Sequence, residues 1–459
     1  MSVFSLSNLK KTWYYLQKNG IRNAVWAVLE RIGQEQEAYT WQEPDEKTLS
    51  FQREHSASLR ISIVVPTYRT KKEHLEAMLN SVSNQSYPHW ELIVADAGDT
   101  AESVQSWAKK NGICLREAAD ASNLAEWKDQ SIVLCTLSEN KGISANTNAG
   151  IELAAGDAVG LLDHDDLLTA NALWEMADCL EKEKKRGKQK LVLFSDEDKC
   201  DGAASRFYEP NFKPDFDGEL LLTNNYICHF TVIETAFLKE LKLRSGFDGA
   251  QDYDLVLRAY AAGGQFVHVP KVLYHWRCHE ASTASNPQSK RYAYEAGQRA
   301  LEDYCLRKGW KATVSELKHL GFYREDYEGS VFCQRPEIGI WAKPLPEGRD
   351  VFGIRHPKGF LVSGLYENDG SMRYAGLRKG YSGPMHRAAL QQSAPAADLR
   401  SMEVCSALKE RCEQAIAELK DACQGLPTAA QEKKIVQKSM EFCKEAAAAG
   451  YGILWDPQA

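Results

Sequence analysis

The chain has 459 residues, of which 44% are apolar and 26% are charged. A chain of this length buries a sizeable core, and at roughly 150 residues per domain it holds two or three domains, or one large α/β domain with extensions. The 56 basic and 63 acidic residues leave a net charge of −7, and without a long basic run this balance speaks against nucleic-acid binding. The composition also excludes collagen-like, disordered and coiled-coil classes.

The 12 cysteines are scattered singly between Cys114 and Cys443, and no two of them are spaced as CxxC. The sequence therefore gives no support to a zinc finger, a thioredoxin-like redox site or an Fe–S cradle. Scattered single cysteines are typical of proteins in a reducing compartment. The sequence shows neither a run of about 18 apolar residues nor a signal-peptide pattern, so we expect a cytoplasmic protein.

Residues 1–33 carry apolar side chains at helical spacing, and Gly20 divides them into two short amphipathic segments. Five basic residues in this stretch face a single acidic one, Glu30. Such a helix either lies on an anionic membrane surface, at the inner face of the cell membrane, or packs on the main domain as an arm. Residues 34–59 are polar and acidic and predict a linker, so we treat 1–59 as one region.

Short apolar strands alternate with helices from residue 60 onward. The pattern predicts strands at 61–66, 91–96, 132–136, 157–163 and 191–198, and helices at about 72–86, 100–110, 143–156 and 169–186. This alternation is typical of an α/β fold with a mostly parallel, doubly wound sheet. Ligands bind beyond the carboxyl ends of the strands in such a sheet.

Acidic residues repeatedly end these apolar strands and should share one rim of the sheet. They are Asp96, Asp99, Asp163, Asp165, Asp166, Asp196, Glu197 and Asp198. Two of them, Asp163 and Asp165, are separated by one residue directly after a buried strand. Such a pair can address one hard divalent cation, because Mg²⁺ and Mn²⁺ bind carboxylates together with phosphate oxygens and water. Alternatively, Asp166 simply caps the helix that follows.

In these stretches the chain resembles the inverting, GT-A-fold glycosyltransferases of family 2. The resemblance covers about residues 60–310, and it rests on ISIVVPTYRT, ELIVADAGDT, ENKGISANTNAGIELAAGDAVGLLDHDDLL, GFDGAQDYDLVLRAYAAGG and HVPKVLYHWR. It is strongest for bacterial members that build O-antigen, capsule and other surface polysaccharides, including rhamnosyltransferase-like ones. It implies a UDP- or dTDP-sugar donor, a Mn²⁺ or Mg²⁺ ion, inversion at the anomeric carbon and a glycan acceptor, in particular a lipid-linked one.

The same resemblance assigns residues to the nucleotide sugar. It places Pro66 and Tyr68 beside the base and ribose, and it makes Asp96 the acceptor of the pyrimidine N3–H. The commoner Asp-Asp-Gly-Ser of the family reads Asp-Ala-Gly-Asp at 96–99, which leaves one base-reading carboxylate. The remaining residues that match this side of the site are Asn140, Gly142, Asn148, Asp163 and His164, with Asp163 near the ribose. For Asn140 a glycine turn before a helix is the alternative reading.

For the metal and the diphosphate, the resemblance implies Asp165 as a ligand, with His275 as a further ligand or a diphosphate contact. An imidazole suits Mn²⁺, and Arg277 can stabilise diphosphate charge. A lone histidine beside tryptophan is also a common structural feature. A bound cation neutralises the negative charge of the departing diphosphate without proton transfer.

Asp252 matches the catalytic base of the family. It follows the Gly-rich turn at 246–249 and begins a predicted helix. A carboxylate within hydrogen-bond reach of an acceptor hydroxyl can take its proton as the hydroxyl attacks. Alternatively, Asp252 only caps this helix. Asp254 points elsewhere on a helix and is the less suitable base.

Three further residues are candidates for the acceptor side: Asp196, Glu197 and Trp276. The two acids contact acceptor hydroxyls or merely cap and solubilise a strand end. A glycoside hydrolase also uses paired acids, but it does not need acids at strand ends that suit a nucleotide and a metal. A non-catalytic transferase-like subunit that binds nucleotide or glycan is the remaining alternative to an enzyme.

Residues 311–459 form a predicted α/β extension in which one stretch echoes the first part. AAGGQFVHVP at 261–270 and AAGYGILWDP at 448–457 both predict a helix end, a glycine stop, a strand and a proline. Apolar residues between 436 and 447 are spaced for the preceding helix. We therefore expect a partial, degenerate transferase repeat that packs on the enzyme or forms a homo-oligomer contact, although the similarity can also arise by chance.

Overall fold

The computed structural model describes residues 39–118, 128–278, 291–316, 321–328 and 334, and the backbone of five short strands nearer the C-terminus. The chain divides into two compact units. One consists of Glu37–Lys213 and Asn225–Tyr304, and the other of Met1–Gln36, Pro214–Asn224 and Cys305–Ala459. The arm predicted at 1–33 lies outside the described residues. The predicted boundaries at 59 and 310 remain predictions.

Where the sequence predicted a linker, the structure has helix α2 (Glu46–Glu54). Asp45 starts it, because its carboxylate accepts a hydrogen bond of 2.8 Å from the backbone N–H of Thr48. The helix is fixed to the domain by Gln52, which is buried and donates to Glu175 at 3.3 Å. The polar composition of this segment is therefore that of a capped surface helix.

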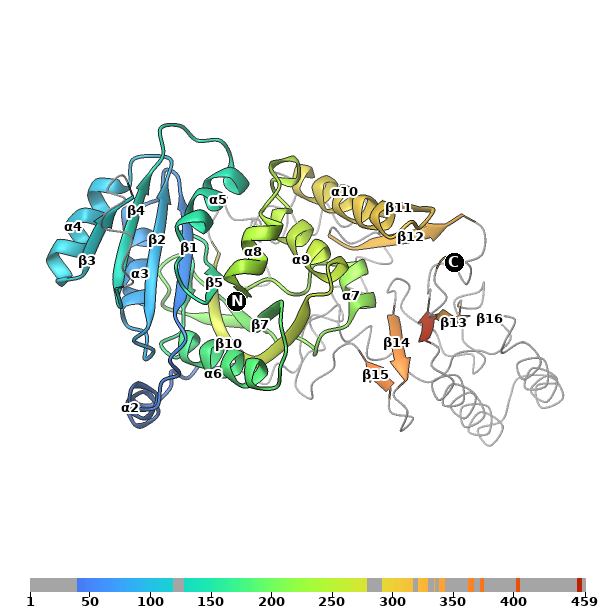
Figure 1. Ribbon diagram of the computed structural model, residues 1–459, viewed down its shortest axis with the longest axis horizontal. Coiled ribbons are helices and arrows are strands. Elements are labelled where there is room, and N and C mark those ends of the chain that lie inside the picture. The colour runs from blue at the N-terminus through green and yellow to red at the C-terminus, as the bar shows by residue number, and fades with distance from the viewer. Residues whose placement is uncertain are drawn as a thin grey trace, which may run out of the picture. The chain divides into compact units, whose positions relative to one another are not determined.

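The larger unit is built on a ten-stranded sheet in the order β3-β4-β2-β1-β5-β9-β7-β10-β6, with β8 paired to β7 (Figure 1). The strands β3, β4, β2, β1 and β5 run parallel to one another. The strand β9 then runs antiparallel between β5 and β7, and β10 is parallel to β7. The bounds are β1 Ile61–Thr67, β2 Trp90–Asp96, β3 Cys114–Glu117, β4 Ser131–Thr136, β5 Ala158–Leu161, β6 Leu167–Leu168, β7 Leu191–Cys200, β8 Phe207–Asn211, β9 Thr231–Glu234 and β10 Gln265–Arg277.

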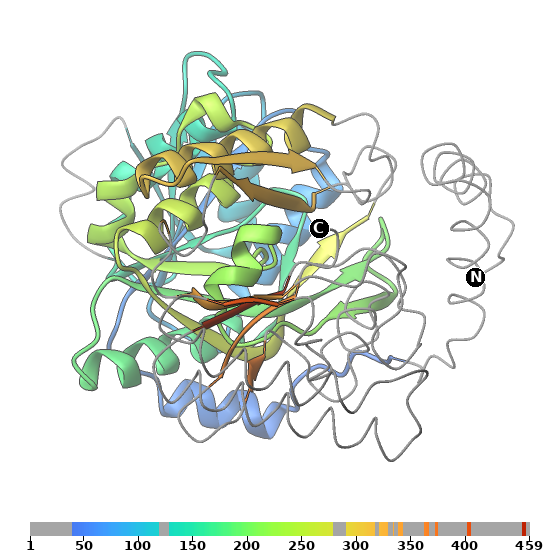
Figure 2. The same cartoon turned by 90° about the vertical axis from the view of Figure 1, so that its right-hand side faces the viewer.

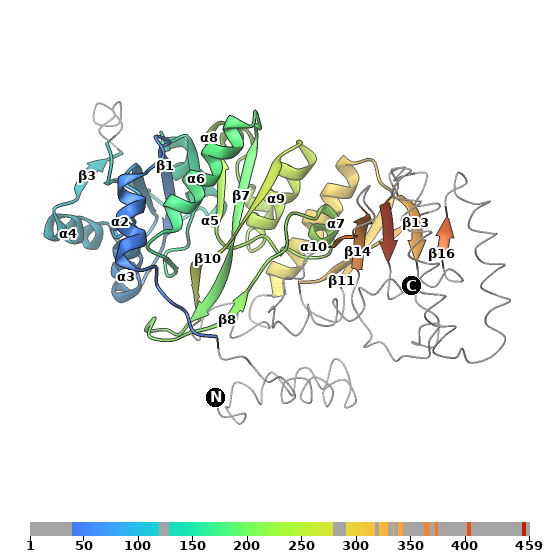
Figure 3. The same cartoon turned by 90° about the horizontal axis from the view of Figure 1, so that it is seen from below.

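Helices cover both faces of this sheet, as the predicted doubly wound α/β fold requires. On one face lie α3, α4 and α6 (Figure 3), and on the other lie α5, α8 and α9. Their bounds are α3 Lys72–Ser83, α4 Ala101–Asn111, α5 Ile143–Leu153, α6 Ala172–Lys185, α8 Thr235–Leu241 and α9 Gln251–Ala261; the 3-10 helix η2 Ser245–Phe247 precedes α9, and α10 Arg291–Arg307 follows the sheet.

The core forms because side chains of a strand alternate between the two faces of the sheet. In β1, Ile63 and Val65 pack in the cluster beneath α3 and α6, while Val64 packs in the cluster beneath α5. All three are fully buried. Burying such a side chain contributes about 2 kcal/mol relative to leaving it exposed, so the short apolar runs of the sequence form the centre of the fold.

The stretch HVPKVLYHWR lies within one strand, β10, although it contains a proline. The register with β7 shifts between Val269 and Val272, on either side of Pro270. Proline has no N–H to give to the ladder, and a bulge accommodates it without ending the strand. The strand continues to Arg277 and so carries Tyr274, His275 and Trp276 along the end of β7.

The second unit contains α7 (Gly218–Thr223) and the antiparallel pair β11 (Ala312–Glu316) and β12 (Tyr323–Tyr327). It also has a five-stranded sheet in the order β15-β14-β17-β13-β16, drawn in orange and red in Figure 2. The bounds of these strands are β13 Ile338–Ala342, β14 Val362–Tyr366, β15 Met372–Tyr374, β16 Met402–Val404 and β17 Gly452–Trp455.

The strand β17 coincides with the strand predicted in the tail, but the preceding helix falls at 436–447, outside the described residues. The partial repeat therefore stays a prediction. Within the described part of the chain, no helix is both long enough and apolar enough to cross a membrane.

Candidate functional site

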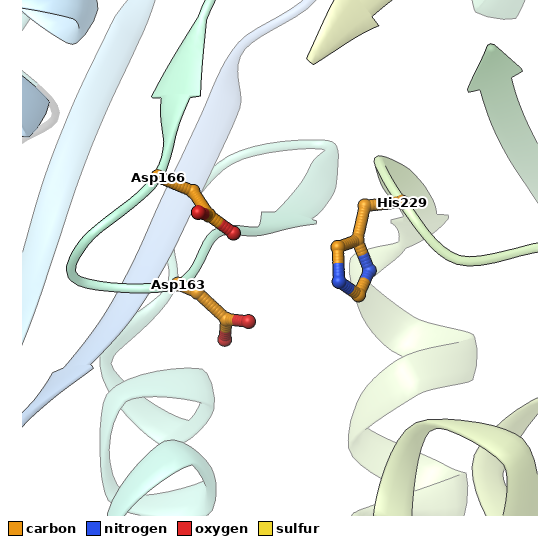
Figure 4. Close-up of side chains that lie close together, drawn as sticks. All are labelled: Asp163, Asp166 and His229. Atoms are coloured by element: carbon orange, nitrogen blue, oxygen red, sulfur yellow. The ribbon is translucent and has the colours of Figure 1, made fainter. Parts of the chain in front are cut away.

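The loop after β5 brings two carboxylates against an imidazole. Asp163 and Asp166 belong to this loop, and the side chain of His229 approaches them from the segment before β9 (Figure 4). One ligand atom from each of the three lies within 4.8 Å of the others. The predicted acidic rim therefore contains a compact oxygen and nitrogen cluster, in which the third member comes from a different part of the chain.

Asp166 is held rigidly within this cluster. It is buried, and its Oδ2 accepts a hydrogen bond of 2.5 Å from the hydroxyl of Tyr274. Its Oδ1 accepts one of 2.7 Å from the backbone N–H of Arg277. Burial, followed by repulsion from Asp165 and Asp163, raises the pKa of Asp166 well above its usual range. The carboxyl does not cap the next helix; it ties the acidic loop to β10.

Arg277, which the sequence assigned to the diphosphate, holds the same loop by its backbone. Its Nε donates to the carbonyl of Asp165 at 2.5 Å, and its Nη1 donates to the carbonyl of Gly202 at 2.7 Å. The residue is only 2% exposed. In this geometry the guanidinium positions the acidic loop, and contact with a diphosphate remains a prediction.

His229 lies between two aromatic rings of β10. Its ring centroid is 5.0 Å from that of Tyr274 and 5.7 Å from that of Trp276, and both contacts are edge-on. Burial and the positive charge of Lys213 lower its pKa to about 3, so the imidazole is neutral near pH 7 and able to act as a ligand. Trp276, assigned on the sequence to the acceptor side, is thus placed beside the cluster.

Sequence reasoning missed His229 as a ligand. In the sequence His229 stands in the stretch NNYICHF at 224–230, where nothing in the spacing points to the acids 60 or more residues earlier. The contact depends on β9 inserting antiparallel between β5 and β7, which the sequence pattern did not predict.

His275, predicted as a metal ligand together with Asp165, has its observed contacts outside the cluster of Asp163, Asp166 and His229, and its role at a metal stays a prediction. Its Nδ1 is 2.5 Å from Oδ1 of Asp198, and the hydroxyl of Tyr39 donates to Oδ2 of the same carboxylate at 2.6 Å. The rings of Trp41 and Phe207 pack against the imidazole at centroid distances of 4.9 and 4.3 Å. Side chains of β10 alternate in direction, so His275 faces away from Tyr274 and Trp276.

Asp196 and Glu197, predicted on the acceptor side, are buried and bonded within the domain. Asp196 Oδ1 accepts from the backbone N–H of Lys213 at 2.8 Å and lies 2.7 Å from Nε2 of His268. Glu197 forms an ion pair of 2.5 Å with the ammonium of Lys213. Burial raises the pKa of Glu197 to about 7, against the opposing effect of Lys213. These acids lie within β7, which continues to Cys200, and belong to a buried hydrogen-bond network.

Asp252 lies in the first turn of α9 and is partly exposed. Its Oδ2 accepts a hydrogen bond of 2.9 Å from Nδ2 of Asn225. Asp254 is used differently, since it is buried and bound by Arg244 and by Arg258. The expectation that Asp254 points elsewhere therefore agrees with the structure, and Asp252 is the carboxylate of this helix that remains accessible.

Asp96 caps the helix α4. Its Oδ2 accepts from the backbone N–H groups of Thr100 and Ala101 at 3.1 and 3.0 Å. Its Oδ1 accepts from the hydroxyls of Thr67 and Thr100 at 2.9 and 2.6 Å and from Gly98 N–H at 3.2 Å. With both oxygens engaged and the side chain 1% exposed, the carboxylate shapes the loop at the end of β2. Its contact with a pyrimidine base stays a prediction.

Of the other predicted nucleotide residues, Asn140 and Gly142 lie in the loop before α5, and Asn148 lies within α5. Asn148 is bonded to both backbone groups of Leu243, at 2.8 and 2.9 Å. The Oδ1 of Asn140 accepts from Gly142 N–H at 3.0 Å and from Asn146 Nδ2 at 2.9 Å. Gly142 has φ of +96°, a conformation that favours glycine. These contacts fix the backbone at the start of α5. The side-chain amides of Asn140 and Asn148 therefore already form hydrogen bonds within the domain.

Pro66 and Tyr68 lie at the end of β1, beside the loop after β2. Pro66 pairs with Ala95 of β2, and Tyr68 is 40% exposed. A Cβ added to Gly98 would lie 3.3 Å from the backbone of Tyr68, so glycine permits the close approach of these two loops. An exposed aromatic ring at the carboxyl end of the parallel strands suits a base or a ribose.

The cluster fits a divalent cation. Its donor set is two carboxylates and a neutral imidazole, a combination that Mn²⁺ accepts well and that Mg²⁺ accepts through its oxygen ligands. Three carboxylates lie in this loop, Asp163, Asp165 and Asp166, and after burial their repulsion is the next cause of the raised pKa of Asp166. A cation between Asp163, Asp166 and His229 would relieve that repulsion.

Comparison with known proteins agrees with this architecture. The model of Glycosyl transferase family 2 matches residues 62–241. O-antigen biosynthesis protein RfbC of Myxococcus xanthus is 34% identical over 256 residues, which are 56% of this chain and 19% of RfbC. Amylovoran biosynthesis glycosyltransferase AmsB of Erwinia amylovora is 27% identical over 232 residues, 47% of this chain and 70% of AmsB.

Among solved structures, S. aureus TarS 1-349 in complex with UDP-GlcNAc covers 54% of this chain and 67% of its own, at 20% identity and a TM-score of 0.41. The chain spans about a fifth of the length of RfbC. The matched segment includes the acidic loop and His229, whereas Asp252 and His275 lie beyond it. Residues 62–241 of this chain are thus similar to Glycosyl transferase family 2.

Proposed function

We propose that the protein is an inverting glycosyltransferase that moves a sugar from a UDP- or dTDP-sugar to a glycan acceptor, in particular a lipid-linked one, in the synthesis of bacterial surface polysaccharide. The observation that carries this proposal is the cluster of Asp163, Asp166 and His229 at the carboxyl end of β5. It is supported by the match to family 2 over the segment that contains the cluster and by relatives named for O-antigen and amylovoran biosynthesis.

In this proposal Asp252 is the general base. It takes the proton of the acceptor hydroxyl as the hydroxyl oxygen bonds to the anomeric carbon, while the bond from that carbon to the nucleoside diphosphate breaks on the opposite face. Attack opposite the leaving group in one step inverts the anomeric centre. Asn225 orients the carboxylate through a hydrogen bond to Oδ2.

Asp163, Asp166 and His229 would hold a divalent cation beside the donor diphosphate. Such a cation supplies charge neutralisation to the leaving nucleoside diphosphate. Arg277 and Tyr274 of β10 fix the acidic loop. The carboxylates of the loop are therefore in position before the donor binds. Preorganised groups of this kind need little rearrangement during the reaction.

The proposal extends to location and partners. We expect the enzyme to act at the cytoplasmic face of the membrane, with the basic stretch 1–33 in peripheral contact with anionic lipid, and with residues 311–459 as a homo-oligomer contact. Co-sedimentation with phosphatidylglycerol vesicles tests the first point, and binding that is unchanged when 1–33 are deleted would count against it. The oligomeric state with and without residues 311–459 tests the second.

A transfer assay tests the central proposal. Purified protein is incubated with Mn²⁺, a panel of UDP-, dTDP- and GDP-sugars and a polyprenyl-diphosphate-linked acceptor, and release of the nucleoside diphosphate is measured. We expect release from a pyrimidine nucleotide sugar, with a product of inverted anomeric configuration by NMR. Nucleotide binding without any turnover would favour a non-catalytic, transferase-like subunit.

A further inference from the structure

One short segment connects the two ends of the candidate site. At its beginning, Asn225 donates to Asp252 at 2.9 Å. Four residues later, His229 faces Asp163 and Asp166 across the cluster. The backbone of residues 225–230 therefore has to hold one conformation for the base and the cation ligands to be in place together.

A buried ammonium group fixes this segment. Lys213 is 1% exposed, and its Nζ donates to the backbone carbonyls of Ile227 at 2.8 Å and His229 at 2.5 Å. The same Nζ is 2.5 Å from Oε2 of Glu197. A lysine ammonium has three donors, and here each has a partner, two of which belong to the backbone of the segment.

Glu197 closes the arrangement from β7. Its Oε2 accepts from the backbone N–H of His229 at 3.2 Å, and its Oε1 accepts from Asn211 Nδ2 at 2.6 Å. The backbone of His229 is therefore held on both sides, through its carbonyl by Lys213 and through its N–H by Glu197. Because β7 belongs to the central sheet, the ion pair connects the segment to that sheet.

We propose that Lys213, paired with Glu197, is a positioning residue of this site, whose ammonium fixes residues 225–230 so that His229 completes the cation cluster and Asn225 orients Asp252. This inference rests on the proposed function. A buried ion pair is a weak source of stability, since an apolar pair of similar volume often stabilises as well. Here the ion pair binds the backbone of His229, whose imidazole belongs to the cation cluster. Its role in this position is to orient that imidazole.

The experiment compares three variants of the full chain. Lys213→Met removes the ammonium and keeps the side-chain length. Glu197→Gln keeps the shape and the lysine but removes the partner charge. The matched control is Arg116→Met, because Arg116 also forms a buried ion pair, with Glu91 at 2.9 Å, but does so at the amino ends of β2 and β4, at the opposite edge of the sheet from the cluster.

Far-UV circular dichroism and the melting temperature establish that each variant is folded, and calorimetric titration of UDP at a fixed Mn²⁺ concentration below saturation gives the apparent dissociation constant of UDP. Substituting a residue that orients a metal ligand typically weakens binding about 10- to 100-fold. We expect about tenfold weaker binding in Lys213→Met and a smaller loss in Glu197→Gln. We expect Arg116→Met to bind as the unaltered protein does, even where its melting temperature falls as far.

Unchanged affinity in folded Lys213→Met overturns the inference, as does an equal loss in Arg116→Met. If Lys213→Met does not fold, Glu197→Gln provides the test. Unchanged UDP affinity in Glu197→Gln then overturns the inference. A wild-type chain that binds Mn²⁺ by electron paramagnetic resonance but not UDP contradicts the proposed donor alone, and the variants are then compared on Mn²⁺. A chain that binds neither overturns the cation site and this inference with it.

Discussion

Asn225 donates a hydrogen bond of 2.9 Å to Asp252, although the two residues come from a loop before β9 and from the first turn of α9. Two positions further along the same helix, Asp254 is buried between two arginines. In this helix, Asp252 is therefore accessible to a substrate, whereas Asp254 stabilises the fold. Substituting each residue in turn distinguishes the two roles.

Replacing Asp252 by asparagine should abolish turnover with little effect on stability. General base catalysis contributes about 100- to 10,000-fold, and we expect the rate of nucleoside diphosphate release to fall by that order. Asp254→Asn is the matched control, because breaking a buried ion pair costs about 3 kcal/mol. It should lower the melting temperature while the folded fraction stays active. The reverse pattern would show that Asp252 is a structural cap.

Replacing His229 should weaken the cation site, whereas replacing His275 should not. His229→Ala removes a ligand atom of the cluster, and we expect at least about tenfold weaker binding of Mn²⁺. In His275→Ala the carboxylate of Asp198 loses a partner at 2.5 Å, so this variant should lose stability and retain the ion. Electron paramagnetic resonance of free Mn²⁺ measures the binding of the ion in both variants. Equal loss in the two variants would contradict the arrangement described.

His229 should also make the domain less stable in acid. Its pKa falls from 6.5 to about 3 in the folded state, so between these values the unfolded chain binds a proton that the folded chain does not. The contribution of His229 to the free energy of unfolding therefore decreases as pH falls from about 6.5 toward 3, whereas the raised pKa values of Glu197 and Asp166 act in the opposite direction. Urea unfolding of the metal-free protein at pH 7 and pH 5, compared between the unaltered protein and His229→Gln, isolates this contribution: the unaltered protein should lose more stability, or gain less, than the variant. An unchanged dependence would show that other groups cause it.

Asp96→Asn should mainly destabilise the protein. An amide offers one acceptor oxygen where the carboxylate uses two, so N–H groups of the α4 start lose a charged partner. A hydrogen bond to a charged group contributes about 1.5–3 kcal/mol, and we expect a loss of that size in urea unfolding. The preference for UDP over GDP should persist. A variant of normal stability that no longer distinguishes the two nucleotides would instead support direct reading of the base.

Much of the fold was predictable because apolar runs and helical spacing are local properties. The strands β1, β2 and β7 and the helices α3 and α6 follow from them, and so does the acidic rim, since parallel strands end at one edge. The strand β9 is short, and its antiparallel insertion depends on pairing with β5 and β7. No local pattern shows such a pairing.

The candidate site was predictable to the same extent. The acidic loop at 163–166 is a contiguous motif, and the structure brings Asp163 and Asp166 of this loop close to His229. His275 contacts Asp198, because alternation along β10 turns it away from Tyr274, and its pairing with Asp165 at a metal stays a prediction. Glu197 illustrates the same limit, since a strand-end acid looks alike in sequence whether it faces a cleft or a buried Lys213.

The most direct test of the central claim is calorimetric titration of UDP into the full chain with Mn²⁺ and with the ion chelated. The account predicts binding that requires the ion and that is lost in Asp163→Asn, while Asp178→Asn, a change on the surface of α6 where Asp178 pairs with Lys182, leaves it unaltered. UDP binding that is equally tight without a divalent ion, or that survives in Asp163→Asn, would contradict it.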